Sequence, residues 1–143
     1  MFGFNPIPIS TVDINGIYIK ESSENFFEYL KSFGVEDDIA LRVLNSKHPL
    51  VVSNADDIKV TILVKDNPRT FIFGEELPYT LSTGQDVVTV ASRDGGTLTF
   101  NTYLAENPET TEVRVLELID DELVSTSTNH LGVKAVNRYK KVS

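Results

Sequence analysis

The side chains in this sequence that could carry out catalysis are few, and none stands in a catalytic pattern. His48 and His130 fall at a predicted helix end and in a predicted turn, without the serine and acid partners of a nucleophilic triad. Paired carboxylates occur in turns or at strand ends, where water solvates them (Asp56-Asp57, Glu75-Glu76 and Asp120-Asp121). A general acid would need one buried carboxyl group with a shifted pKa. The sequence therefore predicts a protein that is not an enzyme.

Motifs for a cofactor or a metal are also missing from the sequence. There is no cysteine, which excludes a thiol nucleophile, a disulfide framework and a cysteine-bound metal. No glycine-rich phosphate loop occurs, and no histidine and glutamate spacing is typical of a metal site. We expect neither a cofactor nor a bound metal.

The composition indicates a globular protein with one domain and disfavours polyanionic partners. The 143 residues are 41% hydrophobic and 24% charged, as in an ordinary soluble domain. The formal net charge is -8, which argues against nucleic acid and against strong binding to anionic membranes, because basic side chains carry both interactions. No stretch approaches the roughly 18 apolar residues of a membrane-spanning helix, and the N-terminal residues do not read as a secretory signal. We expect a cytoplasmic monomer.

Two short helices are predicted near the N-terminus. Ser22 or Ser23 can cap the first helix, and Asp37 or Asp38 the second, which ends before Pro49. One face of the first helix is apolar, because its large side chains recur at i, i+4 and i+7 (Phe26, Leu30 and Phe33). That face must be buried against another part of the protein.

The rest of the chain has the period of two that is typical of strands. A first strand is predicted over 11–20, and alternating runs follow over 50–54, 58–65, 70–76, 86–92, 97–104, 110–119, 122–128 and 133–141. Short turn-forming stretches such as 66–69 separate them and favour antiparallel neighbours. A meander of this length closes best into a barrel that encloses a cavity. The helix pair, inserted between the first two strands, would then cover one mouth of the barrel as a lid.

Several short stretches resemble the intracellular fatty-acid-binding proteins, the cytosolic lipid-binding proteins of the calycin superfamily. The N-terminal matches are Gly16-Ile17-Tyr18, Ser23–Phe26, Glu28–Lys31 and Gly34-Val35, and the later ones are "FGEEL", "SRDGG", "ETTEVR" and "AVNRYKK". Order and spacing agree from about residue 13 to residue 141. The resemblance implies a mainly β fold: a ten-stranded up-and-down antiparallel β-barrel, or β-clam, with a helix-turn-helix lid between its first two strands.

The same resemblance implies the function and the domain organisation. The protein would carry a long-chain fatty acid or similar hydrophobic ligand inside the barrel, and Phe26, Leu30 and Val35 would line the cavity near the lid. The alternative is a carrier of a neutral lipid such as a retinoid alcohol, and a protein-interaction module is a third candidate. Residues 1–12 would be a flexible N-terminal extension, and 13–143 a single lipid-binding barrel domain.

The last strand departs from the family's ligand clamp. The family places an arginine, any residue and a tyrosine there, whereas this chain has Asn137, Arg138 and Tyr139. Because side chains alternate across a strand, an inward Tyr139 makes Asn137 inward and turns Arg138 toward solvent. A local bulge would be needed to bring Arg138 into the cavity.

A second ligand-facing arginine of the family corresponds to Arg114 or, because this segment is two residues longer, to Leu116. Both positions share one face, so Arg114 points inward in either alignment. We predict that Tyr139 and Arg114 hold the ligand headgroup and that Asn137 adds a neutral hydrogen bond. Asn137 would serve an alcohol as well as an acid. Glu112 has the same parity and could instead hold Arg114 away from any ligand.

Overall fold

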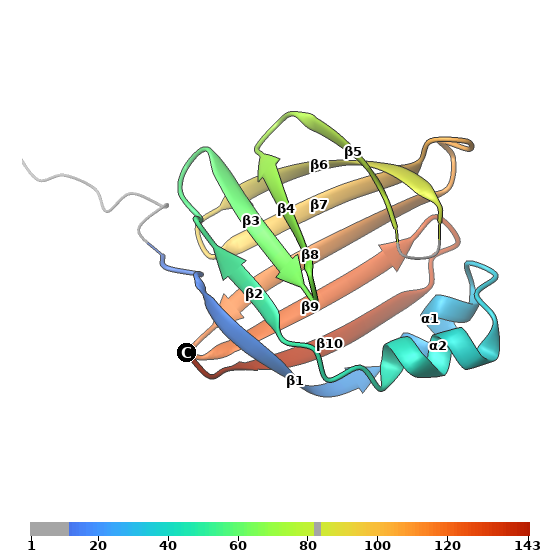
Figure 1. Ribbon diagram of the computed structural model, residues 1–143, viewed down its shortest axis with the longest axis horizontal. Helices are drawn as coiled ribbons and strands as arrows, with labels where there is room; N and C mark the ends of the chain where they lie inside the picture. The colour runs from blue at the N-terminus through green and yellow to red at the C-terminus, as the bar shows by residue number, and fades with distance from the viewer. Residues whose placement is uncertain (1–11, 82–83) are drawn as a thin grey trace, which may run out of the picture.

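The computed structural model describes residues 12–81 and 84–143, which form ten strands and two short helices (Figure 1). The strands are β1 (Gly16–Glu24), β2 (Leu50–Ser53), β3 (Lys59–Val64), β4 (Asn67–Ile72), β5 (Glu76–Thr80), β6 (Asp86–Asp94), β7 (Thr97–Leu104), β8 (Thr111–Ile119), β9 (Glu122–Asn129) and β10 (Lys134–Lys141). The helices α1 (Phe26–Lys31) and α2 (Asp37–Leu44) lie between β1 and β2. This arrangement confirms the predicted mainly β fold.

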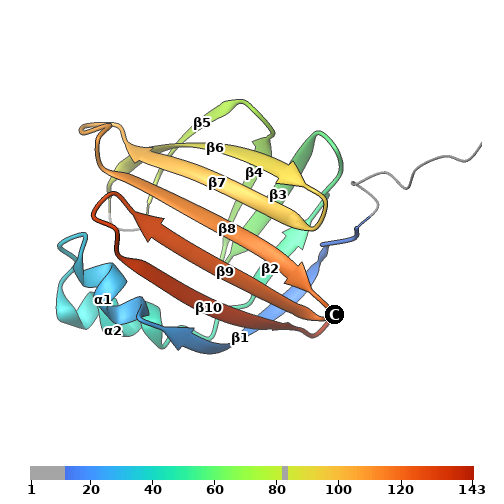
Figure 2. The same cartoon turned by 180° about the vertical axis from the view of Figure 1, so that it is seen from behind.

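One antiparallel sheet contains all ten of these strands, in the order β4-β3-β2-β1-β10-β9-β8-β7-β6-β5. Strands that neighbour each other in the sheet also follow each other in sequence, except β1 and β10, which pair from Tyr18 with Lys141 to Glu24 with Val136. Figures 1 and 2 show the sheet curled on itself, so that β2, β3 and β4 face β7, β8 and β9 across the interior. The two helices lie at one mouth of this barrel.

The barrel is closed by hydrogen-bonded strands everywhere except between β4 and β5, the two edges of the sheet. No ladder joins these two strands within the described residues. A side chain spans the gap instead: Arg69 of β4 donates from Nη2 to the carbonyl oxygen of Thr80 in β5 at 3.2 Å. The structure is therefore a nearly closed barrel.

Strand alternation builds the interior as the sequence pattern predicts. On β9 the buried positions alternate with half-buried ones. The buried apolar cluster collects inward-facing residues from eight of the strands and from the segment before β1. Its fully buried member Tyr18 donates from its hydroxyl to the carbonyl oxygen of Ile14 at 2.7 Å. Burial of this apolar cluster stabilises the curled sheet.

The first helix begins later than predicted. β1 pairs with β10 through an irregularity between Lys20 and Ser22 and continues to Glu24, so Ser22 and Ser23 belong to a strand and do not cap a helix. The N-cap is Asn25, with a φ of 60° in the left-handed region. Asparagine tolerates this backbone conformation better than most residues because its short polar side chain bonds locally.

Three other boundaries differ from the predictions. The predicted strand 70–76 is interrupted at Gly74, whose φ of 84° suits glycine, and a separate β5 follows. The turn predicted over 66–69 covers only 65–66, so Pro68 belongs to β4. Proline is tolerated there because β4 is an edge strand. The N-cap of α2 is Glu36 rather than Asp37 or Asp38, although the helix ends before Pro49 as expected.

The predicted N-terminal extension falls almost entirely outside the described residues. Only Val12 of residues 1–12 is described, and its carbonyl oxygen accepts a hydrogen bond from the Arg93 guanidinium. No helix among the described residues is long and apolar enough to cross a membrane.

Candidate functional site

Two adjoining cavities occupy the barrel interior. The lid cavity, about 390 Å³, lies beneath the helices, and the inner cavity, about 200 Å³, lies against residues of the apolar core such as Leu50 and Phe100. Seven residues line both cavities, and five of these are polar: Tyr79, Thr102, Glu112, Arg114 and Tyr139. The two cavities therefore adjoin, and the described residues that they share form a polar belt between them.

The predicted apolar site residues all lie on the cavity walls. Phe26 and Leu30 of α1 line the lid cavity together with Val35, which follows the helix. Leu116 of β8 is buried, with 4% of its surface exposed, and lines the inner cavity. A long apolar chain placed in the barrel would contact these side chains on both sides of the polar belt.

Arg114 of β8 lies on this belt and is already paired. Its Nη2 is 3.4 Å from Oε2 of Glu112, and its Nε donates to Oγ of Ser127 at 3.2 Å. The side chain is 44% accessible, and because Arg114 lines both cavities this accessible surface faces the interior. The neighbouring Glu112 carboxylate raises the pKa of Arg114, so the guanidinium is charged.

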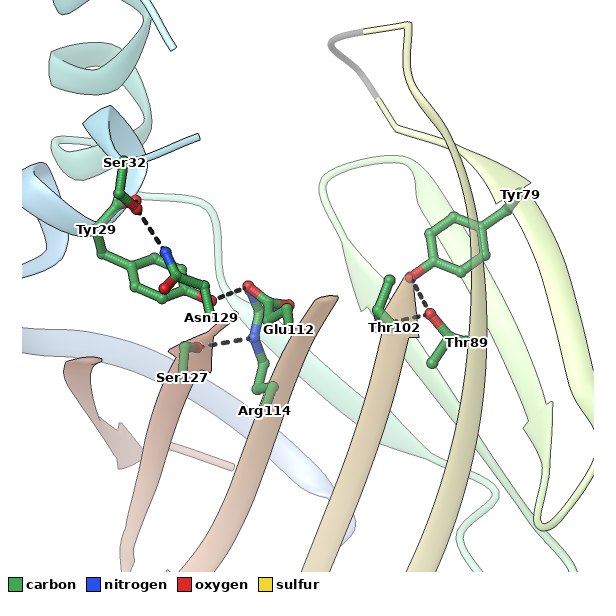
Figure 3. Close-up of polar contacts among 9 residues, drawn as sticks. All are labelled: Tyr29, Ser32, Tyr79, Thr89, Thr102, Glu112, Arg114, Ser127 and Asn129. Atoms are coloured by element: carbon green, nitrogen blue, oxygen red, sulfur yellow. Dashed lines mark hydrogen bonds and ion pairs between the residues drawn. The ribbon is translucent and has the colours of Figure 1, made fainter. Parts of the chain in front are cut away.

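Glu112 also connects the barrel wall to the lid. Tyr29 of α1, which is 1% exposed, donates from its hydroxyl to Oε2 of Glu112 at 2.6 Å (Figure 3). Burial and the Glu112 carboxylate raise the pKa of Tyr29, so the phenol keeps the proton that it donates. A second bond runs from Nδ2 of Asn129 in β9 to Oγ of Ser32 at 2.6 Å. Two side-chain hydrogen bonds thus hold the first helix to β8 and β9.

A second polar group lies on β5, β6 and β7. The hydroxyl of Tyr79 is 2.9 Å from that of Thr89, which is 2.7 Å from the hydroxyl of Thr102 (Figure 3). We call these three residues the hydroxyl cluster, and we call Tyr29, Glu112, Arg114 and Ser127 the charged cluster. Arg69 stacks on the hydroxyl cluster, with its guanidinium carbon 4.3 Å from the centre of the Tyr79 ring.

The last strand places its three predicted residues as alternation requires. Tyr139 lines both cavities, and burial raises its pKa, so it is a neutral donor. Asn137 faces inward too but is 5% exposed, lies behind the cavity wall, and its Oδ1 has no hydrogen-bond partner among the described residues. Arg138 turns the other way, with Nη1 3.3 Å from Oε1 of Glu122. The register with β9 is unbroken, so no bulge reverses this order.

The sequence analysis missed a second cation in the lid cavity. Lys20 of β1 donates from Nζ to the carbonyl oxygen of Leu44 at 2.7 Å and lies 5.3 Å from the centre of the Phe26 ring. Burial lowers the pKa of Lys20. The sequence does carry a signal for this position: Lys20 lies two residues after the buried Tyr18 on the same strand, so alternation places both side chains on the inner face.

The remaining residues with reactive side chains do not assemble. His48 lines the lid cavity, whereas the ring of His130 packs 6.4 Å from that of Phe33. Across 12–81 and 84–143, no group of three or more histidine or acidic side chains comes together in a way that could hold a metal ion. What the site offers is a set of binding groups: one ion pair and several hydroxyls on the wall of an apolar cavity.

Comparison with known proteins adds independent information. No protein-family model matches the chain. Fatty acid-binding protein 1 of Fasciola gigantica is 31% identical over 133 residues, which cover 90% of this chain and 98% of that protein. The liver-type fatty acid-binding protein of Epinephelus coioides is 29% identical over 87% of this chain and 96% of its own length. The Schistosoma mansoni fatty acid binding protein, solved in complex with arachidonic acid, superposes with a TM-score of 0.83 at 27% identity, covering 94% of this chain and 99% of that chain.

Proposed function

The chain belongs to the fatty-acid-binding protein family, and we propose that it carries a long-chain fatty acid or a similar hydrophobic ligand inside its barrel. The observation that supports this most directly is the pair of adjoining cavities, which have apolar walls on both sides of a polar belt that holds Arg114. The S. mansoni protein, which has the same fold, was solved with arachidonic acid. The relatives are lipid-binding carriers, so the protein is not an enzyme.

We propose the following roles within the cavity. Arg114 and Tyr139 bind the headgroup, because one supplies a charge and the other a neutral hydroxyl on the shared wall of the two cavities. The apolar chain contacts Phe26, Leu30, Val35 and Leu116. Asn137 and Arg138 are not among the described residues that line these two cavities, so we assign them no direct contact with the ligand.

We also propose that the protein works as a monomer in the cytoplasm. Membership of an intracellular carrier family supports this location. The net charge of -8 gives no attraction to anionic membrane surfaces, so the proposed partner is the lipid itself.

The test is displacement of an environment-sensitive fluorescent fatty acid from delipidated, folded protein. We expect oleate to displace the probe at micromolar concentrations or below. Organic extraction of freshly purified protein provides a second measurement, and we expect lipid in near-stoichiometric amount. Failure of oleate to displace the probe, in protein whose circular dichroism shows intact β structure, would contradict the proposal.

A neutral lipid is the second candidate ligand, and one observation favours it. The guanidinium of Arg114 already has the Glu112 carboxylate as its partner. Oleyl alcohol, which matches oleate in chain length, therefore belongs in the same displacement series.

A further inference from the structure

At the proposed headgroup position, Arg114 already has an ion-pair partner before any ligand arrives. Among the described residues that line the two cavities, Glu112 is the one acid, and it lies against Arg114. Two other cations line one cavity each and lie outside the belt: Lys20 donates to the carbonyl oxygen of Leu44, and Arg69 donates to that of Thr80. The polar belt is therefore an ion pair flanked by neutral hydroxyls.

An ionised ligand headgroup meets a cost at this ion pair. To reach Arg114, a ligand carboxylate must displace the Glu112 carboxylate or lie beside it. Like charges repel strongly where water is scarce, and a displaced Glu112 would lose its cation in the interior. The loss of the old ion pair therefore reduces, but does not cancel, the gain from the new one.

A neutral headgroup that donates a hydrogen bond meets no such cost. Both described contacts of the Glu112 carboxylate, from Tyr29 and from Arg114, go to Oε2. A carboxylate oxygen accepts more than one hydrogen bond, and Oε1 is the second acceptor of the group. An alcohol or amide can therefore donate to Glu112 while Arg114 and Tyr29 keep their positions.

We propose that Glu112 determines the headgroup specificity of the cavity, by lowering its preference for ionised carboxylates and admitting lipids with a neutral, hydrogen-bond-donating headgroup such as a primary alcohol or an amide. This inference rests on the proposed function as a lipid carrier. Glu112 acts by contact with the headgroup and by occupying Arg114, so its removal changes the relative affinity of two ligands that share one chain.

The experiment compares oleate with oleyl alcohol on the wild type and on Glu112→Gln. Glutamine keeps the shape of the side chain and a carbonyl oxygen that accepts from Tyr29, but it removes the negative charge. We expect the ratio of oleate affinity to oleyl alcohol affinity to rise roughly tenfold or more. In the variant the oleate carboxylate can bind Arg114 without competition from the Glu112 carboxylate, and hydrogen bonds between charged groups are worth about this much. Glu117→Gln is the matched control, because Glu117 lies on the same strand, is exposed and lines neither cavity.

The outcomes separate this inference from the proposed function. An unchanged ratio in folded Glu112→Gln, or an equal rise in Glu117→Gln, would overturn the role of Glu112 while leaving the carrier function intact. If the wild type bound neither ligand, the proposed function would fail and this inference with it. Should Glu112→Gln not fold, Glu112→Leu, which replaces the acid with an apolar wall, gives the same comparison of the two ligands.

Discussion

The charged cluster and the hydroxyl cluster lie on the walls of the same cavity but differ in what a ligand can do to them. In the hydroxyl cluster, Thr89 is 1% exposed and lies between Tyr79 and Thr102, so its hydroxyl bonds are made within the wall. In the charged cluster, the ion pair of Glu112 and Arg114 faces the cavity and can exchange partners. Burial of polar groups alone thus does not mark a binding site. The headgroup site that we propose is instead the ion pair, whose accessible surface faces the cavity.

The largest effect is expected from Arg114→Ala, which removes the cation of the charged cluster. Oleate affinity should fall by roughly tenfold to a hundredfold, since hydrogen bonds to charged groups are worth about 1.5–3 kcal/mol. Oleyl alcohol affinity should change much less. Displacement of the fluorescent fatty acid measures both. Arg138→Ala is the control, because that arginine faces outward toward Glu122. Full retention of oleate affinity in Arg114→Ala would mean that another cation, such as Lys20, binds the ligand carboxylate.

An intermediate effect, on stability alone, is expected from Thr89→Val in the hydroxyl cluster. Valine fills the same space but leaves the hydroxyls of Tyr79 and Thr102 without their shared partner, which should lower the free energy of unfolding by about 1–2 kcal/mol. Denaturant unfolding measures this, and Thr61→Val, whose hydroxyl bonds that of Thr70 at the exposed side of the sheet, should cost less. The ratio of oleate to oleyl alcohol affinity should stay unchanged. A shift in that ratio would mean that the hydroxyl cluster also contacts the headgroup.

The smallest effect is expected from Tyr29→Phe, which removes the hydroxyl that joins the lid to Glu112. Its loss should lower the free energy of unfolding by about 1 kcal/mol at neutral pH, less than is usual for a bond to a charged group, because Glu112 keeps Arg114 as a partner. Because the pKa of Tyr29 is raised above its ordinary value of 10.0, the folded state holds this proton more tightly than the unfolded state. The contribution is therefore full below pH 10 and declines as the pH rises further.

Denaturant unfolding of wild type and Tyr29→Phe at neutral and strongly alkaline pH tests this sign. The difference between the two proteins should narrow above pH 10, because only the wild type has the phenol to lose. The other tyrosines titrate in both proteins and cancel in the difference. A gap that widens with pH would contradict the assigned hydrogen bond.

The sequence predicted the parts of this molecule that depend on local pattern. Period-two alternation gave most strands, and the shared parity of Glu112 and Arg114 predicted that both face inward. The break at Gly74 and the strand that contains Pro78 were missed, because propensity disfavours proline in strands and an edge strand tolerates it. Ser22 and Ser23 suited a helix cap better than a strand, but pairing with β10 outweighed that preference.

The connections between elements could not be read from local pattern. The bond between Tyr29 and Glu112, for example, depends on how α1 docks against β8. The position of the two adjoining cavities depends in the same way on packing across the barrel. Such contacts join residues far apart in sequence, and a single sequence carries no direct signal for them.

The pairing of β1 with β10 also governs how the chain can fold. The hairpins from β6 to β9 join neighbouring segments and can form early. Tyr18, in contrast, can pair with Lys141 only when nearly the whole described chain is available. Contacts of such long sequence separation slow folding, because a large loop must be closed before they form. During synthesis, β1 and the aromatic side chains of α1 emerge before the later strands. The β10 side of β1 stays unpaired until the end of the described chain has been made. We therefore expect closure at the β1–β10 seam to limit the rate of folding, and the early exposure of this N-terminal segment to make it the part of the nascent chain most in need of chaperone protection.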